Sequence, residues 1–453
     1  MIRSLRILQI LSLLFLHQVV SAQQSWTLED CINHALQNNI QLKRSELQER
    51  VSQKEFTQST FELGPNLSGF YNHQLLNGTT FNQYTLKFES LKNQSGSLGL
   101  SSEITLFDGF YSINNRARLK YQLEAAKQQS EVLKNSVTLN VVAAYLQVLL
   151  ESEMLNLAEE QYELSQKQLD KAEAELKLGK VSQADYLNLK AQSINQKALL
   201  TSARNRFKYY TLELAQLLEV NDVENFTIAI PSIMASDADV HSISFDAIHN
   251  DIAQHRPEIK KAEFMLKSAK KGLNMSYGLL SPRITLGYQL GSGYDQSAWY
   301  ITPDSVFVQY PSYTYRQQLN DYIQHRIYFR VSIPIFQKLS NHLQISKSKI
   351  QLLDANYALE EAQKAVYKDV QSSLSDAQLS WDNYLAFSET VESYKELFDQ
   401  TVNKYNLGMV NAIEVGIAQN NLVKAQADLL HAKYSYVLKL KILDFYRGVP
   451  ITL

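Results

Sequence analysis

The stretch that decides the fold reads VVAAYLQVLLESEMLNLAEEQYELSQKQLDKAEAEL over residues 141–176. Apolar or small residues recur in it at spacings of three and four, interrupted at Glu151 and Ser165: Val141, Ala144, Val148, Leu155, Ala158, Tyr162, Leu169, Ala172 and Leu176. The average spacing of about 3.5 residues is that of helices that supercoil around each other. The stretch therefore predicts a long coiled-coil helix.

This helix lies inside a longer segment that occurs twice. Both copies open with an apolar pair that ends in phenylalanine, at Phe107 and Phe336, and close on Leu-Gly, at Gly179 and Gly408. The two bounds are 72 positions apart in each copy, which indicates an internal repeat. At about 1.5 Å per residue, seventy helical residues make a rod of roughly 100 Å. Helices of compact domains run to only about 20 residues, so this rod spans a distance.

The rest of the chain falls into two halves around these rods, with a first repeat over 23–220, a connecting segment over 221–243 and a second repeat over 244–453. The elements expected in them are helices at about 28–61, 112–178, 183–218, 244–279, 338–407 and 411–446, and strands within about 66–107 and 283–335. The two shorter helices of each half total about seventy residues, the length of the rod. Stacked end to end they would flank it, as in a helical tube of uniform height. Residues 226–230 could add a short strand.

The N-terminus reads as a secretory signal peptide over residues 1–22. Arg3 and Arg6 precede an apolar core at 7–16, and small residues at 20–22 suit signal peptidase. No later run of eighteen apolar residues exists, which argues against helical membrane spans. Without Arg3 and Arg6, 42 basic and 46 acidic residues leave a net charge of −4, and nothing suggests nucleic acid as a partner. Cys31, the single cysteine, is expected as a buried apolar residue of the first helix.

Between the helices the hydrophobic period changes to two, which is typical of strands with one apolar face. The alternating residues are Leu98, Leu100, Ile104 and Leu106, then Ile284, Leu286, Tyr288 and Leu290, then Ile327, Phe329, Val331 and Ile333. Tyr84, Leu86 and Phe88 also alternate, so residues 81–90 either extend the first hairpin or form an extra strand.

The second hairpin encloses a loop rich in aromatic residues: Trp299, Tyr300, Phe307, Tyr310, Tyr313, Tyr315 and Tyr322. An aromatic cluster alone most often reflects packing. Beside alternating strands, however, it favours the rim of a membrane barrel. Four strands cannot close a barrel and lipid does not tolerate open sheet edges, so several chains would have to share one.

The order and spacing of several motifs resemble the TolC-like outer-membrane efflux protein family over the whole mature chain. The motifs are Leu106-Phe107-Asp108-Gly109, Leu178-Gly179-x-Val181-Ser182, His255-Arg256-Pro257-Glu258, Ile333-Pro334-Ile335-Phe336, Tyr405-Asn406-Leu407-Gly408 and the closing segment 421–448. No single motif is specific, but their order and duplication are.

The resemblance implies a mixed α+β, mainly helical fold that acts as a homotrimer. Each chain would give four strands to a twelve-stranded transmembrane barrel in the outer membrane, and its helices would form a periplasmic tunnel closed at the far end. The family's function would make it the passive exit duct of a tripartite efflux or type I secretion system. Its partners would be a periplasmic adaptor protein, an inner-membrane pump and outer-membrane lipid.

The resemblance also places functional residues at the two helix-to-helix turns. Asp185, Tyr405 and Glu414 match positions that hold the periplasmic mouth shut in the family, although acids in a first helical turn also simply favour the helix dipole. Gly179 and Gly408 are expected as left-handed helix caps.

Two further positions at the turns concern the partner and the selectivity. The resemblance implies that Val181 and Val410 meet the adaptor, and the alternative is a small apolar contact that closes each turn. Val410 and Ile417 stand where the family often has polar residues, which puts a ring of acids deeper in the mouth in doubt.

On the strands, Glu103, Arg326 and Arg330 fall on the polar phase, which would face the lumen. They could tune passage or be ordinary hydrated residues.

No catalytic constellation, metal site or cofactor motif accompanies these features. The nine histidines are scattered, and no glycine-rich phosphate loop exists. We therefore expect a protein that is not an enzyme. The alternative to a channel is a secreted coiled-coil scaffold or adhesin without a pore, whose hairpins would lie in water.

Overall fold

The computed structural model describes residues 25–82, 86–223, 225–231, 240–243, 245, 256–309, 311–449 and 451–452. The expected signal peptide lies outside these residues. The chain forms two compact units, a helical unit (Met1–Glu46, Gln129–Ile259, Gln363–Leu453) and a sheet unit (Leu47–Gln128, Lys260–Ala362). Each unit contains segments from both repeats expected from the sequence.

Most of the described residues are helical, and the helix lengths repeat. The helices are α2 (Leu28–Asn38), α3 (Ile40–Phe61), α4 (Tyr111–Lys177), α5 (Gln183–Leu217), η1 (Val240–Ser242), α7 (Pro257–Gly278), α8 (Tyr315–Asp321), α9 (Ser340–Asn406) and α10 (Ala412–Tyr446). The helices α4 and α9 have 67 residues each, and α5 and α10 have 35 each, so the internal repeat extends to equal lengths. The helix expected from about 244 begins as α7 at Pro257, and most of the residues before it lie outside the described part.

One expectation was wrong, because the first helix is broken. The sequence predicts a single helix over about 28–61, but α2 and α3 meet at Asn39, whose ψ of 125° is not helical. The Asn39 side-chain oxygen accepts hydrogen bonds from the backbone N–H groups of Gln41 (2.9 Å) and Leu42 (3.2 Å). Asn39 therefore caps the start of α3, a role that asparagine fills well.

The core of the helical unit surrounds the middle of α4. Its buried residues include Val137, Val141, Val142, Tyr145, Leu146, Val148 and Leu149 of α4, with Cys31, Leu214, Leu218, Tyr434 and Val437 from other elements. An 18-residue window of α4 is apolar enough to cross a membrane, but half of it is buried, as in a core helix. As expected, Cys31 is buried on α2, and this burial raises the pKa of its thiol to about 12. Residues 226–230 form a single parallel bridge, between Ile228 and Trp26, in place of a strand.

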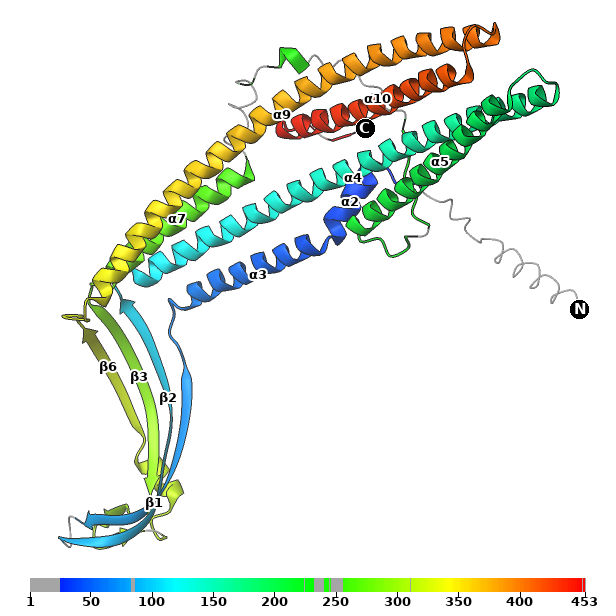
Figure 1. Ribbon diagram of the computed structural model, residues 1–453. Helices are drawn as coiled ribbons and strands as arrows, with labels where there is room; N and C mark the ends of the chain where they lie inside the picture. The colour runs from blue at the N-terminus through cyan, green and yellow to red at the C-terminus, as the bar shows by residue number, and fades with distance from the viewer. Residues whose placement is uncertain are drawn as a thin grey trace, which may run out of the picture. The chain divides into compact units, whose positions relative to one another are not determined.

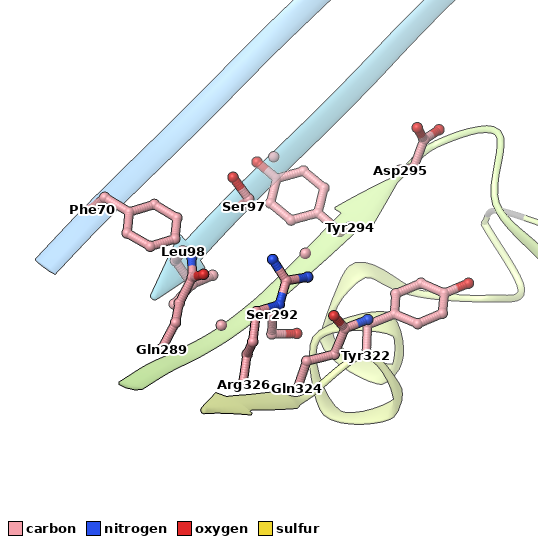
Figure 2. Close-up of a pocket in the computed structure, with 13 residues that line it drawn as sticks. Phe70, Ser97, Leu98, Gln289, Ser292, Tyr294, Asp295, Tyr322, Gln324 and Arg326 are labelled. Atoms are coloured by element: carbon pink, nitrogen blue, oxygen red, sulfur yellow. The ribbon is translucent and has the colours of Figure 1, made fainter. Parts of the chain in front are cut away.

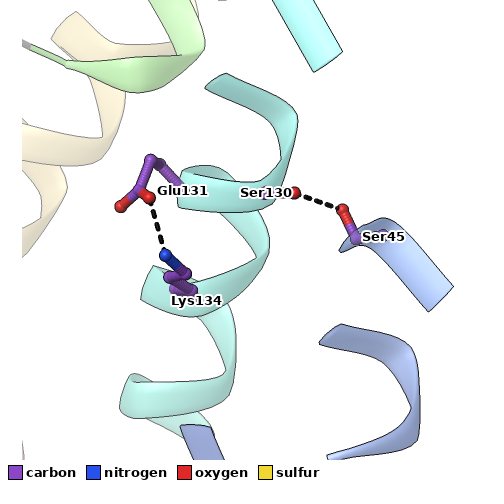
Figure 3. A network of polar contacts seen from close by, with 4 residues as sticks. All are labelled: Ser45, Ser130, Glu131 and Lys134. Atoms are coloured by element: carbon purple, nitrogen blue, oxygen red, sulfur yellow. Dashed lines mark hydrogen bonds and ion pairs between the residues drawn. The ribbon is translucent and has the colours of Figure 1, made fainter. Parts of the chain in front are cut away.

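Polar contacts join the helices of this unit. Figure 3 shows the hydroxyl groups of Ser45 on α3 and Ser130 on α4 at 2.7 Å, next to the Lys134–Glu131 ion pair on α4. In Figure 1, α4 runs beside α5, and α9 beside α10. The pair α9 and α10 is joined by Lys439 and Asp376, whose charged atoms lie 2.6 Å apart.

The sheet unit is built on one antiparallel sheet with the strand order β1-β2-β3-β6 (Figure 1). Its strands are β1 (Ser68–Asn82), β2 (Lys87–Phe107), β3 (Arg283–Asp295) and β6 (Gln324–Ser332). Because β1 pairs with β2 as far as Asn82 with Lys87, residues 81–82 and 87–90 extend the hairpin. Tyr84 and its neighbours at 83 and 85 lie outside the described part. The longer loop of the second hairpin carries β4 (Trp299–Ile301), β5 (Phe307–Gln309) and α8.

The register of the strands separates two faces of the sheet. Leu98, Leu100, Leu286, Tyr288, Leu290, Ile327, Phe329 and Val331 share one face, while Glu103, Thr105, Thr285, Gln289, Arg326, Tyr328 and Arg330 share the other. Most of the apolar side chains are exposed, Ile327 to 76% and Phe329 to 62%. The sheet therefore presents an uncovered apolar face, which in soluble monomers is rarely this extensive.

The aromatic loop residues divide between packing and exposure. Tyr313 is buried and its hydroxyl donates to Asp321 (3.0 Å), while the Tyr315 ring lies 4.6 Å from that of Tyr294 on β3. Tyr322 is partly exposed. Tyr310 and the side chains of Trp299, Tyr300 and Phe307 lie outside the described part.

Candidate functional site

The two helix-to-helix turns of the helical unit have the same backbone design. In the first, the Lys180 N–H donates to the Glu175 carbonyl and the Gly179 N–H to the Leu176 carbonyl, both at 2.9 Å. In the second, Met409 and Gly408 donate in the same pattern, again at 2.9 Å. These are Schellman caps, which require a left-handed residue at the glycine position. Gly179 (φ 71°) and Gly408 (φ 75°) adopt it, and no atom lies within 4 Å of where a Cβ would stand.

Each turn then starts the next helix with a polar cap and an acid. The Ser182 hydroxyl accepts from the Asp185 N–H (3.1 Å) and donates to the Asp185 carboxylate (2.6 Å). The Asn411 side-chain oxygen accepts from the Glu414 N–H (3.0 Å). Asp185 and Glu414 thus occupy equivalent positions near a helix N-terminus, where a negative charge is stabilised.

Tyr405, near the end of α9, lies close to the acids of the first turn. Burial, together with the negative charges of Glu175 and Asp185, raises the pKa of the Tyr405 hydroxyl. The structure therefore brings together two of the three residues expected at the mouth. Glu414 has no part in this effect.

Tyr405 and Glu175 line a small cavity at the ends of α4, α5, α9 and α10, whose lining does not include Asp185 or Glu414. It has a volume of about 100 Å³ and is lined by Lys171, Glu175, Gln192, Tyr405, Asn406 and Val415, among others. The Lys171 ammonium donates to the Asn406 side-chain oxygen at 3.4 Å, which joins α4 to α9. The cavity therefore lies where four helix ends meet, and the Lys171–Asn406 hydrogen bond joins two of them.

Further along the helices, a chain of glutamines joins three of them. Gln192 of α5 donates to Gln419 of α10, and Gln419 donates to Gln161 of α4, both at 3.1 Å. Gln419 is 1% exposed. Breaking this chain would leave buried amide groups unpaired, at about 1 to 3 kcal/mol for each group.

Val181 and Val410 occupy equivalent places just after the two glycines. Both are partly exposed, while their neighbours Leu178, Leu407 and Met409 are exposed to about 70% each. The turns therefore present apolar side chains to their surroundings. Ile417, one turn into α10, is also exposed.

On the polar face of the sheet, Glu103 and Tyr328 are joined across β3. The Tyr328 hydroxyl donates to the Glu103 carboxylate at 3.1 Å. To do so its ring lies over Gly287, where a Cβ would stand 2.1 Å from the ring. Arg330 lies with its guanidinium carbon 5.3 Å from the centre of the same ring, a cation–π distance.

Arg326 lies in a pocket of about 500 Å³ on the sheet. Figure 2 shows Arg326 among the residues that line this pocket, with Gln289, Gln324, Tyr322 and Asp295. Gly291 and Gly293 also line the pocket, so part of its wall is backbone.

Sequence reasoning missed Lys171, Glu175 and the three glutamines. Glu175 carried a usable signal, because an acid in the last turns of a helix opposes the helix dipole and calls for another explanation. The glutamines carried none, since a polar residue on a helix reads as surface. Within the described part of the chain, no group of three or more histidine, cysteine, aspartate or glutamate side chains could hold a metal ion.

A model of the family described as outer membrane efflux protein matches residues 31–219 and 248–448. Outer membrane protein TolC of Escherichia coli (strain K12) is 22% identical over 356 residues, which are 76% of this chain and 69% of TolC. The probable efflux pump outer membrane protein TtgC of Pseudomonas putida is 22% identical over 438 residues, 92% of this chain and 83% of TtgC. The structure of the Campylobacter jejuni CmeC outer membrane channel is similar with a TM-score of 0.79 at 17% identity, covering 93% of this chain and 85% of CmeC.

Proposed function

Since this chain belongs to the outer membrane efflux protein family, we propose that three copies of it build one export duct. Family membership confirms the resemblance drawn from the motifs, and it makes the chain an efflux channel of the outer membrane and not an enzyme. In the proposed assembly, three sheet units close a twelve-stranded barrel in the membrane. The helical units form a periplasmic tunnel.

One observation carries the proposal: the sheet has one polar and one exposed apolar face, and its outer strands β1 and β6 are edges. Lipid can cover the apolar face, but a free strand edge in lipid leaves backbone groups unpaired at several kcal/mol each. Pairing β6 of one copy with β1 of the next removes every edge. Three copies give twelve strands, within the range of known outer-membrane barrels.

The mouth of the tunnel would be formed by the two helix-to-helix turns. Asp185, Tyr405 and Glu414 are the proposed gate residues, and Glu175 and Lys171 line the cavity with Tyr405. Opening would separate the helix ends there, as a rearrangement of packed helices. Energy would come from an inner-membrane pump, and the duct itself would be passive.

The partners follow from the same assembly. An efflux component in the outer membrane needs a pump, and we propose that a periplasmic adaptor docks at the apolar turns through Val181 and Val410. The chain would thereby complete a tripartite efflux or type I secretion system.

Purification in detergent tests the assembly. We expect a trimer whose migration in SDS gels changes on heating, and stepwise currents when it is added to a planar bilayer. A monodisperse monomer without detergent would instead support the scaffold or adhesin alternative. In that case the hairpins would lie in water, and no current would appear.

The gate is tested in the same bilayer. Asp185→Ala combined with Tyr405→Phe is expected to raise the single-channel conductance severalfold, because both side chains would help to close the mouth. Lys167→Ala, on the exposed Glu163–Lys167 pair of α4, is the matched control and is expected to leave the conductance unchanged. Equal conductance in all three proteins would contradict the assignment of the gate.

The docking sites are tested by crosslinking. A photoreactive residue at position 181 or 410 should crosslink to the adaptor in cells, while one at Lys197, exposed on α5, should not. Crosslinking at position 197 alone would move the contact away from the turns.

A further inference from the structure

The polar face of the sheet carries an excess of positive charge that the export function does not by itself require. Between the rows of Gln289 and Arg283, its charged residues are Arg283, Arg326, Arg330 and Glu103. The next acid on this face is Asp295, six residues further along β3, or about 20 Å at 3.3 Å per residue. The three arginines and Glu103 are called the arginine band below.

The one acid of the band is already hydrogen-bonded, whereas the arginines are not neutralised. Glu103 accepts from the Tyr328 hydroxyl. Arg283 donates to the Thr105 hydroxyl at 3.2 Å, and Arg330 lies against the Tyr328 ring. Arg326 has no ion pair or hydrogen bond to any residue that the structure describes. The band therefore has a net charge of +2 per chain, which its own contacts do not cancel.

Near Arg326 the pocket suits an oxyanion, and Asp295, an acid that lines the same pocket, stands six residues further along β3 from the row of Arg326. A guanidinium offers a planar pair of N–H donors that matches a carboxylate or a phosphate. Gln289 and Gln324 add amide donors at the same pocket, and Gly291 and Gly293 keep its wall free of side chains. Rings of arginine are a recurring solution for selecting anions in pores.

We propose that the arginine band makes the inner wall of the barrel selective for anions, with Arg326 as the main binding residue for a carboxylate or phosphate group on the cargo. This inference rests on the proposed trimeric barrel, in which the polar face lines the lumen. Three copies would then place a charge of about +6 around one section of the duct, since each contributes +2.

The turns of the helical unit also carry charged residues, and their influence must be separated from that of the band in any test. The acids Glu175, Asp185 and Glu414 stand there together with Lys171, Lys177, Lys180 and Lys404. A measurement of the total current alone combines the effect of the charges at the turns with that of the arginine band. A polyanion applied from the strand side meets the arginine band first.

The experiment uses the full-length channel inserted from one side of a planar bilayer, with inorganic pyrophosphate added to the chamber that the strands face. We expect pyrophosphate to block the wild-type current from that side. Arg326→Gln should raise the half-blocking concentration by about tenfold, because it removes charge-assisted hydrogen bonds. Glu103→Gln should lower it, because it removes the opposing charge while keeping an acceptor for Tyr328.

Two controls separate the band from general charge effects. Arg316→Gln removes an exposed arginine of α8, outside the four strands, and is expected to leave the block unchanged. In a KCl gradient, Arg326→Gln with Arg330→Gln should shift the reversal potential toward that of a cation-selective pore, and Glu103→Gln should shift it the other way. Heat-dependent migration in SDS gels confirms that each variant still assembles.

The outcomes distinguish the proposed arginine band from the proposed trimeric barrel. If the wild-type channel conducts but Arg326→Gln and Arg330→Gln change neither the block nor the reversal potential, the arginine band is overturned and the duct stands. If no protein conducts and none assembles, the proposed barrel fails, and the selectivity of its lumen fails with it.

Discussion

The two joints between strand and helix have the same backbone but different residues. Residues 107–111 lead from β2 into α4, and residues 336–340 lead from β6 into α9, at equivalent positions of the two repeats. Each joint places two consecutive residues in the left-handed region: Gly109 (φ 68°) with Phe110 (φ 62°), and Lys338 (φ 51°) with Leu339 (φ 63°). Because Lys338 adopts the conformation that Gly109 adopts, left-handed backbone alone does not explain the glycine.

The difference lies in what packs against each joint. A Cβ on Gly109 would stand 2.6 Å from the Gly278 carbonyl oxygen and 2.5 Å from the Ser281 Cβ, so the end of α7 touches this joint directly. At the second joint, Lys338 is exposed, and the Asn341 side chain reaches the Leu279 carbonyl at 2.8 Å. Glycine thus permits a close backbone contact at one joint, and an asparagine side chain makes the contact at the other.

Of the substitutions at the joints and turns, Gly109→Ala should lower the free energy of unfolding most. It adds the cost of a left-handed alanine, about 1 to 2 kcal/mol, to the cost of overpacking, about 1 to 3 kcal/mol. We expect the free energy of unfolding in detergent, measured by denaturant titration, to fall by about 3 kcal/mol. Gly78→Ala is the control, since nothing lies within 4 Å of its Cβ position. If Gly109→Ala and Gly78→Ala were equally stable, the close contact between Gly109 and the end of α7 would not be what distinguishes the two joints.

Gly179→Ala and Gly408→Ala isolate the backbone cost without crowding, because space around both glycines is open. Each should lower the free energy of unfolding by about 1 to 2 kcal/mol, less than Gly109→Ala. The same titration measures both. A loss as large as that of Gly109→Ala would mean that the backbone conformation, not the contact with α7, dominates at the first joint.

Periodicity predicted the elements on both sides of the joints but not the joints themselves. The 72-residue spacing and the alternation in the strands depend on local pattern, and the structure has helices of equal length and a sheet with two distinct faces. Asn39 is a position where periodicity did not predict the structure. An asparagine within a polar helical stretch gives little warning of a break, because its capping role depends on the backbone it creates.

In the candidate sites too, local pattern predicted some features and contacts between distant segments determined the others. The strand period of two predicted that Glu103, Arg326 and Arg330 share one face, and the repeat predicted that Asp185 and Glu414 occupy equivalent positions. That Tyr328 lies over Gly287 to reach Glu103, or that Glu175 approaches Tyr405, depends on contacts between distant segments. A single sequence contains no periodic signal for such contacts.

Asn341→Ala tests the bridge at the second joint. It leaves the Leu279 carbonyl without the Asn341 donor, and the free energy of unfolding should fall by about 1 kcal/mol. Ser340→Ala, which alters the exposed neighbouring residue, should change it by less than about 0.5 kcal/mol. Equal effects of the two substitutions would show that the contact between α9 and the end of α7 contributes nothing measurable.

Lys338→Gly is expected to have the smallest effect, and the opposite sign. The substitution removes the strain of a lysine in the left-handed region, which stabilises the folded state by about 1 to 2 kcal/mol. It also increases the conformational entropy of the unfolded chain, which destabilises the protein by about 0.4 to 1 kcal/mol. The free energy of unfolding should therefore rise by about 0.5 kcal/mol. Lys338→Ala, which keeps the left-handed Cβ, should leave it near the wild-type value. If Lys338→Gly destabilised the protein while Lys338→Ala did not, the strain assigned to the second joint would be absent, and the two joints would differ in backbone energy as well as in packing.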